Sequence, residues 1–221
     1  NPPIEVPQGA IRFNTDSQKL EFFAQDRWHE FATHVAGDNL QGGQGRGLVM
    51  QGINPSKVDA VSFVDITSGG GGSDFGDATT DRRGPAGAGS RTRILSAGGN
   101  GPGTSSTVRA NIDFFTVAST GDGTDFGDLS TGSRSAMGGM GNQTRGLFSG
   151  GYTPSVSDTI DAVEIASTGS SFDFGNLSVG RWDPSAFASQ TRGVLANGTA
   201  VSAGNSVSNV IDFVTISTSG N

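Results

Sequence analysis

The sequence contains no cysteine, and among its 221 residues it has only two histidines and two lysines. Without cysteine the chain has no disulfide, no thiol nucleophile and no thiolate metal ligand. Both histidines, His29 and His34, stand near the N-terminus. The rest of the chain therefore lacks the material for a histidine-based catalytic triad or zinc site.

Positive charge is scarce, and the formal net charge at pH 7 is −7. Because phosphate neutralisation supplies most of the affinity of nucleic-acid-binding proteins, we expect no nucleic-acid partner. No apolar run approaches the roughly 20 residues of a membrane-spanning helix, so we also expect no membrane insertion. The sequence begins without Met and without a signal peptide, which we interpret as a processed or partial chain.

Glycine is abundant, with 36 copies, and it recurs in register with other residues. Four segments open with an arginine, and an Asp-Phe-Gly triplet follows in the first three. A further arginine, the marker arginine, stands eleven residues before each later opening arginine. The opening arginines are Arg46, Arg93, Arg145 and Arg192, the triplet phenylalanines are Phe75, Phe126 and Phe174, and the marker arginines are Arg82, Arg134 and Arg181. This periodicity of about 50 residues identifies a repeat protein.

Each repeat is expected to form four short strands. In the third repeat these are a small-residue strand over 135–141 and further strands over 145–151, 160–166 and 172–177. Apolar and acidic residues alternate along 160–166, so we expect its acids to point away from a half-buried face. No segment carries a helical apolar stripe with caps, and helices should be nearly absent.

The order of these features resembles the kelch repeat. A kelch unit has an arginine, a small-residue strand, an apolar strand ending in Gly-Gly, another apolar strand and a large aromatic residue. The third repeat matches through Arg134, Gly150-Gly151 and Phe174. The match weakens at Gln51-Gly52 and Asn197-Gly198, which replace the double glycine, and at the aromatic position, where kelch favours Trp.

The resemblance implies an all-β fold, a kelch-like β-propeller of four-stranded blades over residues 37–221. The repeats span about 46–92, 93–144, 145–191 and an incomplete 192–221. Either an N-terminal strand completes the fourth blade, or the natural chain continues. Because the sequence stops within a repeat, we favour a longer propeller.

Residues 1–36 stand outside the repeat and are expected to form an N-terminal β-module. Strands over 11–13, 19–23 and 27–31 are expected, with an aromatic cluster that we interpret as a small core rather than a ligand platform. The string GAIRFNTDSQKLEFFAQDRWHEF resembles a β-module of bacteriophage tail-fibre and head-fibre proteins. The kelch-like copies also resemble units in virion proteins of phages that infect marine bacteria.

The repeated motifs are expected to serve the scaffold. The Asp-Phe-Gly triplets lack the other signatures of a kinase. Asp122, Asp125 and Asp128 could form a Ca²⁺ loop, but turn formation is favoured, and we expect no metal and no cofactor. The opening arginines either ring the channel and bind an anion or contact interblade carbonyls or a repeated aspartate, and we favour the second reading. The repeated aspartates are Asp113, Asp161 and Asp212.

Residues that depart from the repeat are the better candidates for binding. These are Arg109 in an insertion over 101–110, Tyr152 as the single tyrosine, and Trp182 directly after a marker arginine. Aromatic and arginine side chains on variable loops are typical binding anchors, although ordinary loop decoration is an alternative.

The resemblances imply a non-enzymatic virion structural protein on the tail or capsid surface, with no catalytic residue. Its N-terminal module would bind other virion proteins, and its propeller would present a recognition face to a host-surface glycan or protein, with the chain as a homo-oligomer. A kelch-type protein-interaction scaffold, extracellular or on a cell surface, is the alternative. A glycan-degrading enzyme is a third possibility and would need a close carboxylate pair.

Overall fold

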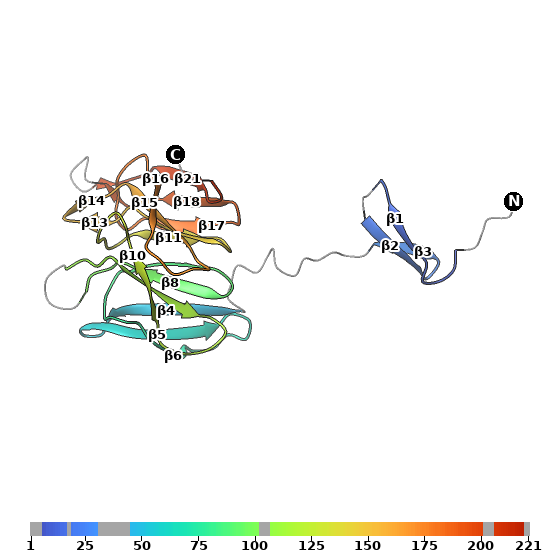
Figure 1. Ribbon diagram of the computed structural model, residues 1–221, viewed down its shortest axis with the longest axis horizontal. Helices are drawn as coiled ribbons and strands as arrows, with labels where there is room; N and C mark the ends of the chain where they lie inside the picture. The colour runs from blue at the N-terminus through green and yellow to red at the C-terminus, as the bar shows by residue number, and fades with distance from the viewer. Residues whose placement is uncertain (1–5, 17–18, 31–44, 102–106, 201–205, 219–221) are drawn as a thin grey trace. The chain divides into compact units, whose positions relative to one another are not determined.

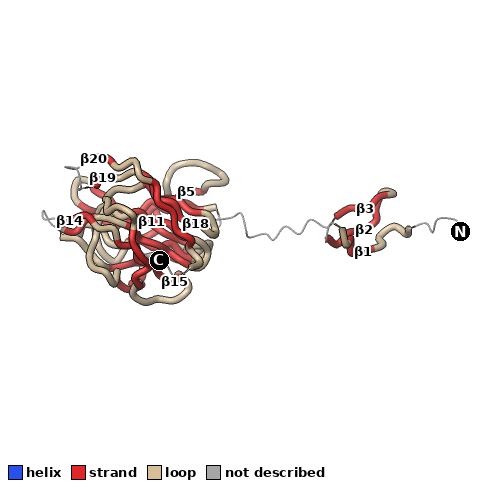
Figure 2. Tube along the Cα trace, turned by 90° about the horizontal axis from the view of Figure 1, so that it is seen from above, coloured by secondary structure: helices blue, strands red, loops and turns tan. Residues whose placement is uncertain are grey.

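The computed structural model describes residues 6–16, 19–30, 45–101, 107–200 and 206–218. The chain divides into two compact units, residues 1–39 and residues 40–221. The expected boundary near residue 36 lies outside the described residues, as do Phe31 and His34. The described parts of both units consist of strands and loops, and they contain no helix that could cross a membrane (Figure 2).

The first unit is a three-stranded antiparallel meander of β1 (Ile11–Asn14), β2 (Lys19–Ala24) and β3 (Arg27–Glu30). The turn between β2 and β3 is Gln25-Asp26, and both residues have positive φ, 52° and 59°. Two such residues form the tight hairpin turn whose twist matches that of the strands. The three strands lie where the sequence predicts them.

The aromatic residues of the first unit pack on one another. The ring of Phe23 lies edge-on to Trp28 at 5.3 Å between centroids, and the Arg12 guanidinium sits 4.1 Å from the Trp28 ring centroid. Arg12 also pairs with the buried Glu21. Hydrogen bonds from Asn14 and Arg12 hold the pKa of Glu21 below its ordinary value. Trp28 is therefore partly covered by its neighbours, which agrees with a small core.

The described part of the second unit contains four antiparallel sheets of three or four strands, here called blades 1 to 4 (Figure 1). Blade 1 is formed by β4 (Arg46–Ile53), β5 (Lys57–Asp65) and β6 (Ser73–Asp77). Blade 2 is formed by β7 (Ala86–Gly89), β8 (Arg93–Ala97), β9 (Asn111–Thr116) and β10 (Thr124–Asp128). Blade 3 is formed by β11 (Gly138–Gly141), β12 (Arg145–Ser149), β15 (Thr159–Glu164) and β16 (Phe172–Asn176). Blade 4 is formed by β17 (Ser185–Ala188), β18 (Arg192–Ala196) and β21 (Ile211–Thr215).

Two short hairpins extend from blades 3 and 4. They are β13 (Tyr152–Thr153) with β14 (Ser155–Val156), and β19 (Thr199–Ala200) with β20 (Ser206–Val207). The repeat pattern did not predict these hairpins. Each follows the Gly-containing turn of its blade, so each projects from the same end of the sheet.

The blades are out of phase with the repeats counted from the opening arginines. Strand β7 falls within the first repeat, 46–92, yet it pairs with β8 of the second. The small-residue strand is thus the first strand of the blade that follows it. These strands lie side by side in neighbouring blades, β7 against β11 and β11 against β17. A β-carbon on Gly139 would stand 2.2 Å from the carbonyl oxygen of Gly87, so only a glycine fits there.

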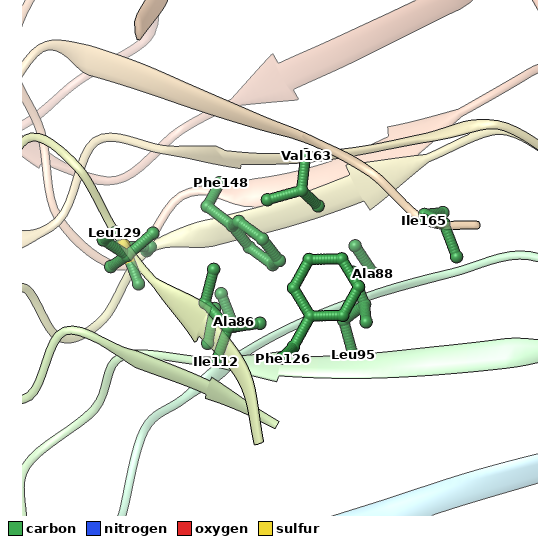
Figure 3. Packing of buried hydrophobic residues seen from close by; sticks show 11 residues of the cluster. Ala86, Ala88, Leu95, Ile112, Phe126, Leu129, Phe148, Val163 and Ile165 are labelled. Carbon is green, nitrogen blue, oxygen red and sulfur yellow. The ribbon is translucent and has the colours of Figure 1, made fainter. Parts of the chain in front are cut away.

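The blades pack face to face through apolar side chains. Between blades 2 and 3, Phe126 lies against Phe148 and Val163 in a cluster of buried residues (Figure 3). Because a blade within the stack is covered on both faces, its middle strand is buried almost throughout. The prediction that the acidic residues of this strand point outward is therefore wrong for Asp161, which is completely buried. Its counterpart Asp113 in blade 2 is completely buried as well.

The Asp-Phe-Gly triplet forms a joint between blades. Phe126 is buried, and its carbonyl oxygen accepts a 2.7 Å hydrogen bond from the backbone N–H of Gly169 in the next blade. Gly127 has φ of 143°, and a β-carbon there would lie 2.5 Å from the Gly169 carbonyl carbon. The triplet thus requires a buried aromatic residue followed by a residue without a side chain.

The Gly-Gly turn forms a second joint. The N–H of Gly99 donates to the carbonyl oxygen of Arg134 in the next blade, and the N–H of Gly151 does the same to Arg181, both at 2.8 Å. Asn197 replaces the first glycine in blade 4 and still adopts positive φ, 64°. Asparagine tolerates this left-handed conformation better than most residues, so the departure from Gly-Gly preserves the turn.

Candidate binding site

The marker arginines are among the most deeply buried charged residues of the second unit. Arg82, Arg134 and Arg181 have exposed fractions of 0%, 1% and 0%. They pair with the repeated aspartates within their own blades, as Arg82 with Asp113, Arg134 with Asp161 and Arg181 with Asp212. The repeat pattern suggested these aspartates as partners of the opening arginines, and the ion pairs in the structure correct that assignment.

Each marker arginine is also held by backbone carbonyls. In blade 3, the Nη1 atom of Arg134 donates to the carbonyl oxygens of Gly150 and Thr159, both at 2.9 Å. Burial lowers the pKa of this guanidinium, and the neighbouring carboxylate of Asp161 opposes the shift. The ordinary pKa of arginine is so high that the guanidinium remains charged despite this shift. These buried pairs hold the blade together and leave no free charge for a ligand.

The opening arginines of blades 1 to 3 contact backbone carbonyls of the next blade. Their Nη1 atoms donate to Val117 from Arg46, to Ile165 from Arg93 and to Ile216 from Arg145, at 2.9, 3.0 and 3.1 Å. This is the interblade contact that the sequence analysis favoured over an anion-binding ring. The carbonyl partners belong to the backbone of the next blade, so these arginines serve the scaffold.

The residue after each marker arginine takes part in a backbone frame. It forms an antiparallel bridge with the residue after the Gly-containing turn of the same blade. The three bridges are Arg83 with Asn100, Ser135 with Tyr152, and Trp182 with Thr199. Because the bridge uses only backbone atoms, its side chains differ from blade to blade without loss of the frame.

Successive blades are linked at the next position. Gly84, Ala136 and Asp183 all have positive φ, between 53° and 63°. The N–H of Ala136 donates to Gly84 at 3.1 Å, and the N–H of Asp183 donates to Ala136 at 2.8 Å. The three bridges therefore stand next to one another, and their side chains surround a common space.

That space is a cavity of about 850 Å³ formed by blades 2, 3 and 4. It is lined by Arg83, Gly84, Asn100, Ser135, Ala136, Tyr152, Pro154, Ser155, Val156, Trp182 and Asp183. Its volume falls within the range of about 300–1,000 Å³ that is usual for small-molecule sites. We call it the mouth cavity.

Two aromatic side chains from neighbouring blades form one wall of the mouth cavity. The ring centroids of Tyr152 and Trp182 are 6.3 Å apart, with the ring planes tilted by 59°. Tyr152 is 41% exposed. Arg83, Asn100 and Asp183 line the same cavity, and their side chains carry a guanidinium, an amide and a carboxylate. The cavity thus combines an aromatic surface with hydrogen-bonding groups of both polarities.

The structure brings together two of the three residues predicted to bind. Tyr152 and Trp182 line the mouth cavity, whereas Arg109 is not among its lining residues. The Nε atom of Arg109 would stand 2.1 Å from a β-carbon on Gly101, so its guanidinium packs on that glycine. Sequence reasoning missed Arg83, Asn100 and Asp183. The sequence feature that could have identified these three residues is their position close to a marker arginine or a Gly-containing turn.

The Asp-rich turn over 122–128 makes a scaffold contact. The Oδ1 atom of Asp122 accepts a 3.0 Å hydrogen bond from the backbone N–H of Asp77 in the preceding blade. Partial burial, followed by repulsion from nearby carboxylates, raises the pKa of Asp77. Across the described ranges, no three histidine, cysteine, aspartate or glutamate side chains gather in a way that could hold a metal ion.

Comparison with known proteins defines the class of fold. No protein-family model matches the chain, and no curated protein matches it in sequence. The described sheets, antiparallel and stacked face to face, resemble those of a kelch propeller. A solved structure with this architecture is that of YjhT, a kelch-repeat β-propeller protein, with a TM-score of 0.61. The alignment has 12% identity and covers 94% of this chain and 77% of that chain, so the similarity establishes the fold alone.

Proposed function

We propose that the protein is a non-enzymatic binding protein that recognises a saccharide in its mouth cavity. The observation that carries the proposal is the convergence of Tyr152 and Trp182 in one cavity. Both residues depart from the repeat, and they come from neighbouring blades. Their backbones belong to the bridges of the frame, but their aromatic side chains are not shared with the equivalent positions of the other blades.

The chemistry of the mouth cavity suits a saccharide. A sugar ring presents C–H groups on its faces, which pack on aromatic rings, and hydroxyl groups at its edge, which donate and accept hydrogen bonds. Arg83 and Asn100 can donate to such hydroxyls, and Asp183 can accept from them. The single positive and single negative charge favour an uncharged ligand over a strongly ionic one.

The number of carboxylates that line the mouth cavity supports a binding function rather than glycoside hydrolysis. Glycoside hydrolysis uses two carboxyl groups, separated by about 5–10 Å, that flank the scissile bond. Asp183 is the single carboxylate among the described residues that line the cavity. The buried Asp161 is engaged by Arg134, so it is not free to act as an acid or a base.

We further propose that the saccharide belongs to a host surface and that the protein is a virion component. This setting rests on the resemblance of the N-terminal string to phage fibre modules. The first unit would attach the protein to other virion proteins. Many copies on one particle would strengthen weak individual contacts through avidity.

A glycan array probed with the 221-residue protein tests the proposal, followed by calorimetry with a saccharide that binds. We expect Trp182→Ala to weaken the affinity at least tenfold, because the aromatic contact is the centre of the site. Trp28→Ala removes the other tryptophan, which lies in the first unit, and should leave the affinity unchanged. A protein that binds no glycan, or a Trp182→Ala variant with unaltered affinity, would contradict the proposal.

A further inference from the structure

The loop that carries Tyr152 is closed on itself and is bound to the next blade at both ends. Within this loop, residues 151–157, the backbone N–H of Ser157 donates to the carbonyl oxygen of Gly151 at 2.9 Å. The backbone of Arg181 binds both ends, because its carbonyl oxygen accepts from the N–H of Gly151 at 2.8 Å and its N–H donates to Ser157 at 3.1 Å. We call these two hydrogen bonds of Arg181 the clasp.

The clasp joins the two aromatic residues of the mouth cavity. Tyr152 directly follows Gly151 in sequence, and Trp182 directly follows Arg181. Each aromatic residue is tied to its own blade by a backbone bridge, whereas the clasp ties one aromatic residue to the other. The N–H of Asp183, on the other side of Trp182, adds the interblade hydrogen bond described above.

The side chain of Arg181 holds the clasp in place. It is completely buried, it forms an ion pair with Asp212, and its Nη1 atom donates to the carbonyl oxygen of Val210 at 2.8 Å. Both partners lie at the start of β21, so the guanidinium fixes the clasp to the sheet of blade 4. Gly150 leaves room for the clasp, since a β-carbon there would stand 2.5 Å from the carbonyl oxygen of Arg181.

An equivalent clasp lies between blades 2 and 3, and it joins residues of other types. The carbonyl oxygen of Arg134 accepts from Gly99 at 2.8 Å, and the N–H of Arg134 donates to Arg109 at 3.1 Å. The residues that follow Gly99 and Arg134 are Asn100 and Ser135. The clasp thus recurs in the propeller, whereas the link between a tyrosine and a tryptophan is particular to Arg181.

We propose that Arg181 is a positioning residue of the saccharide site, which sets the ring of Tyr152 against that of Trp182 before a ligand enters. This inference rests on the proposed function of the mouth cavity. An aromatic pair that is already ordered loses less conformational freedom when a ligand binds, so the clasp raises the affinity without touching the ligand.

Arg181→Lys in a Trp28→Phe background tests this role, with Trp182 as the single tryptophan. Lysine keeps the charge, but it lacks the guanidinium fork that reaches Asp212 and Val210 together. We expect the tryptophan band of the near-UV circular dichroism spectrum to weaken without ligand, because this band depends on fixed packing of the ring. The affinity for a saccharide that binds on the array should fall about fivefold.

Arg82→Lys is the matched control in the same background. Arg82 is also completely buried, and it pairs with Asp113 of its own blade. Its replacement should cost a similar amount of stability and leave the Trp182 band unchanged. An equal loss of the band in both lysine variants would show general loosening of the propeller and would contradict the positioning role.

Gly150→Ala disturbs the clasp from its other side without altering a charge. Its β-carbon would press on the carbonyl oxygen of Arg181, so we expect the same losses of the Trp182 band and of affinity. Gly127→Ala is the matched control, because its β-carbon would also stand 2.5 Å from backbone of the next blade, but away from the clasp. That variant should keep the Trp182 band.

The outcomes separate the positioning role from the proposed function. An unchanged Trp182 band in both Arg181→Lys and Gly150→Ala would overturn the positioning role. So would unaltered affinity of these variants for a saccharide that the unmodified protein binds. An unmodified protein that binds no saccharide would contradict the proposed function instead, and the band would still decide whether Arg181 orders the aromatic pair.

Discussion

Arg134→Met should lower the free energy of unfolding by about 3–5 kcal/mol, because it leaves the carboxylate of Asp161 buried without its cation. Both side chains are at most 1% exposed. Asp161 would keep hydrogen bonds from hydroxyl groups, including that of Ser171 at 2.6 Å, but hydroxyls do not neutralise a buried charge. Urea denaturation followed by circular dichroism measures the loss.

The double variant Arg134→Met/Asp161→Asn separates the unpaired charge from the loss of packing. Asparagine retains a hydrogen-bonding side chain without the charge, so the double variant should be more stable than the single variant. The first repeat has neither charge of this pair. The residue eleven positions before Arg46 is Val35, which lies outside the described residues, and the counterpart of Asp161 in blade 1 is Ser62. A double variant no more stable than Arg134→Met would contradict this explanation.

Gly139→Ala should destabilise the protein by about 3 kcal/mol, at the upper end of the usual cost of overpacking. The added β-carbon would stand 2.2 Å from the carbonyl oxygen of Gly87 and 2.8 Å from its backbone nitrogen. Backbone atoms cannot rotate away as a flexible side chain can, so strands β7 and β11 must separate. The melting temperature and the urea midpoint should both fall.

Gly71→Ala is the matched control for this substitution. Gly71 lies outside the left-handed region, and no atom lies within 4 Å of a β-carbon placed there. Alanine at such a position should leave stability unchanged or raise it slightly, because it restricts the unfolded chain. Equal melting temperatures for the two alanine variants would show that the close approach of β7 and β11 does not limit stability.

The periodicity of the sequence predicted the kelch-like fold because the blade interfaces impose the same residue types on every copy. Phe126 recurs as Phe75 and Phe174 since each must fill the space before the next blade. The kelch order also placed the small-residue strand over 135–141 before the strand over 145–151, and the pairing of β11 with β12 confirms that order. The repeat bounds counted from the opening arginines nevertheless divide these two strands, because an opening arginine begins the second strand of its blade.

The burial of Asp161 could not be read from alternation along its strand. Alternation along a strand predicts one solvent-exposed face, whereas a blade inside the stack has no solvent-exposed face. A bulge between Ile160 and Asp161 also shifts the register there. The partner of Asp161 is 27 residues away in sequence, at Arg134. Equal spacing of several charged residues in each repeat left more than one pairing open.

Only part of the candidate site could be predicted from the sequence. Tyr152 and Trp182 stood out because they replace other residue types at equivalent positions, and the bridges place both at the mouth. Arg109 stood out equally, but the insertion carries it to Gly101 instead. Where an inserted residue ends up depends on the path of its loop, which periodicity does not specify.

Tryptophan fluorescence offers the most direct test of saccharide binding in the mouth cavity. The chain has two tryptophans, so a Trp28→Phe variant reports on Trp182 alone. Titration with a saccharide that binds on the array should produce a saturable change in Trp182 emission, with the dissociation constant that calorimetry gives. A saccharide that binds by calorimetry yet leaves the emission of Trp182 unchanged would place the binding site outside the mouth cavity.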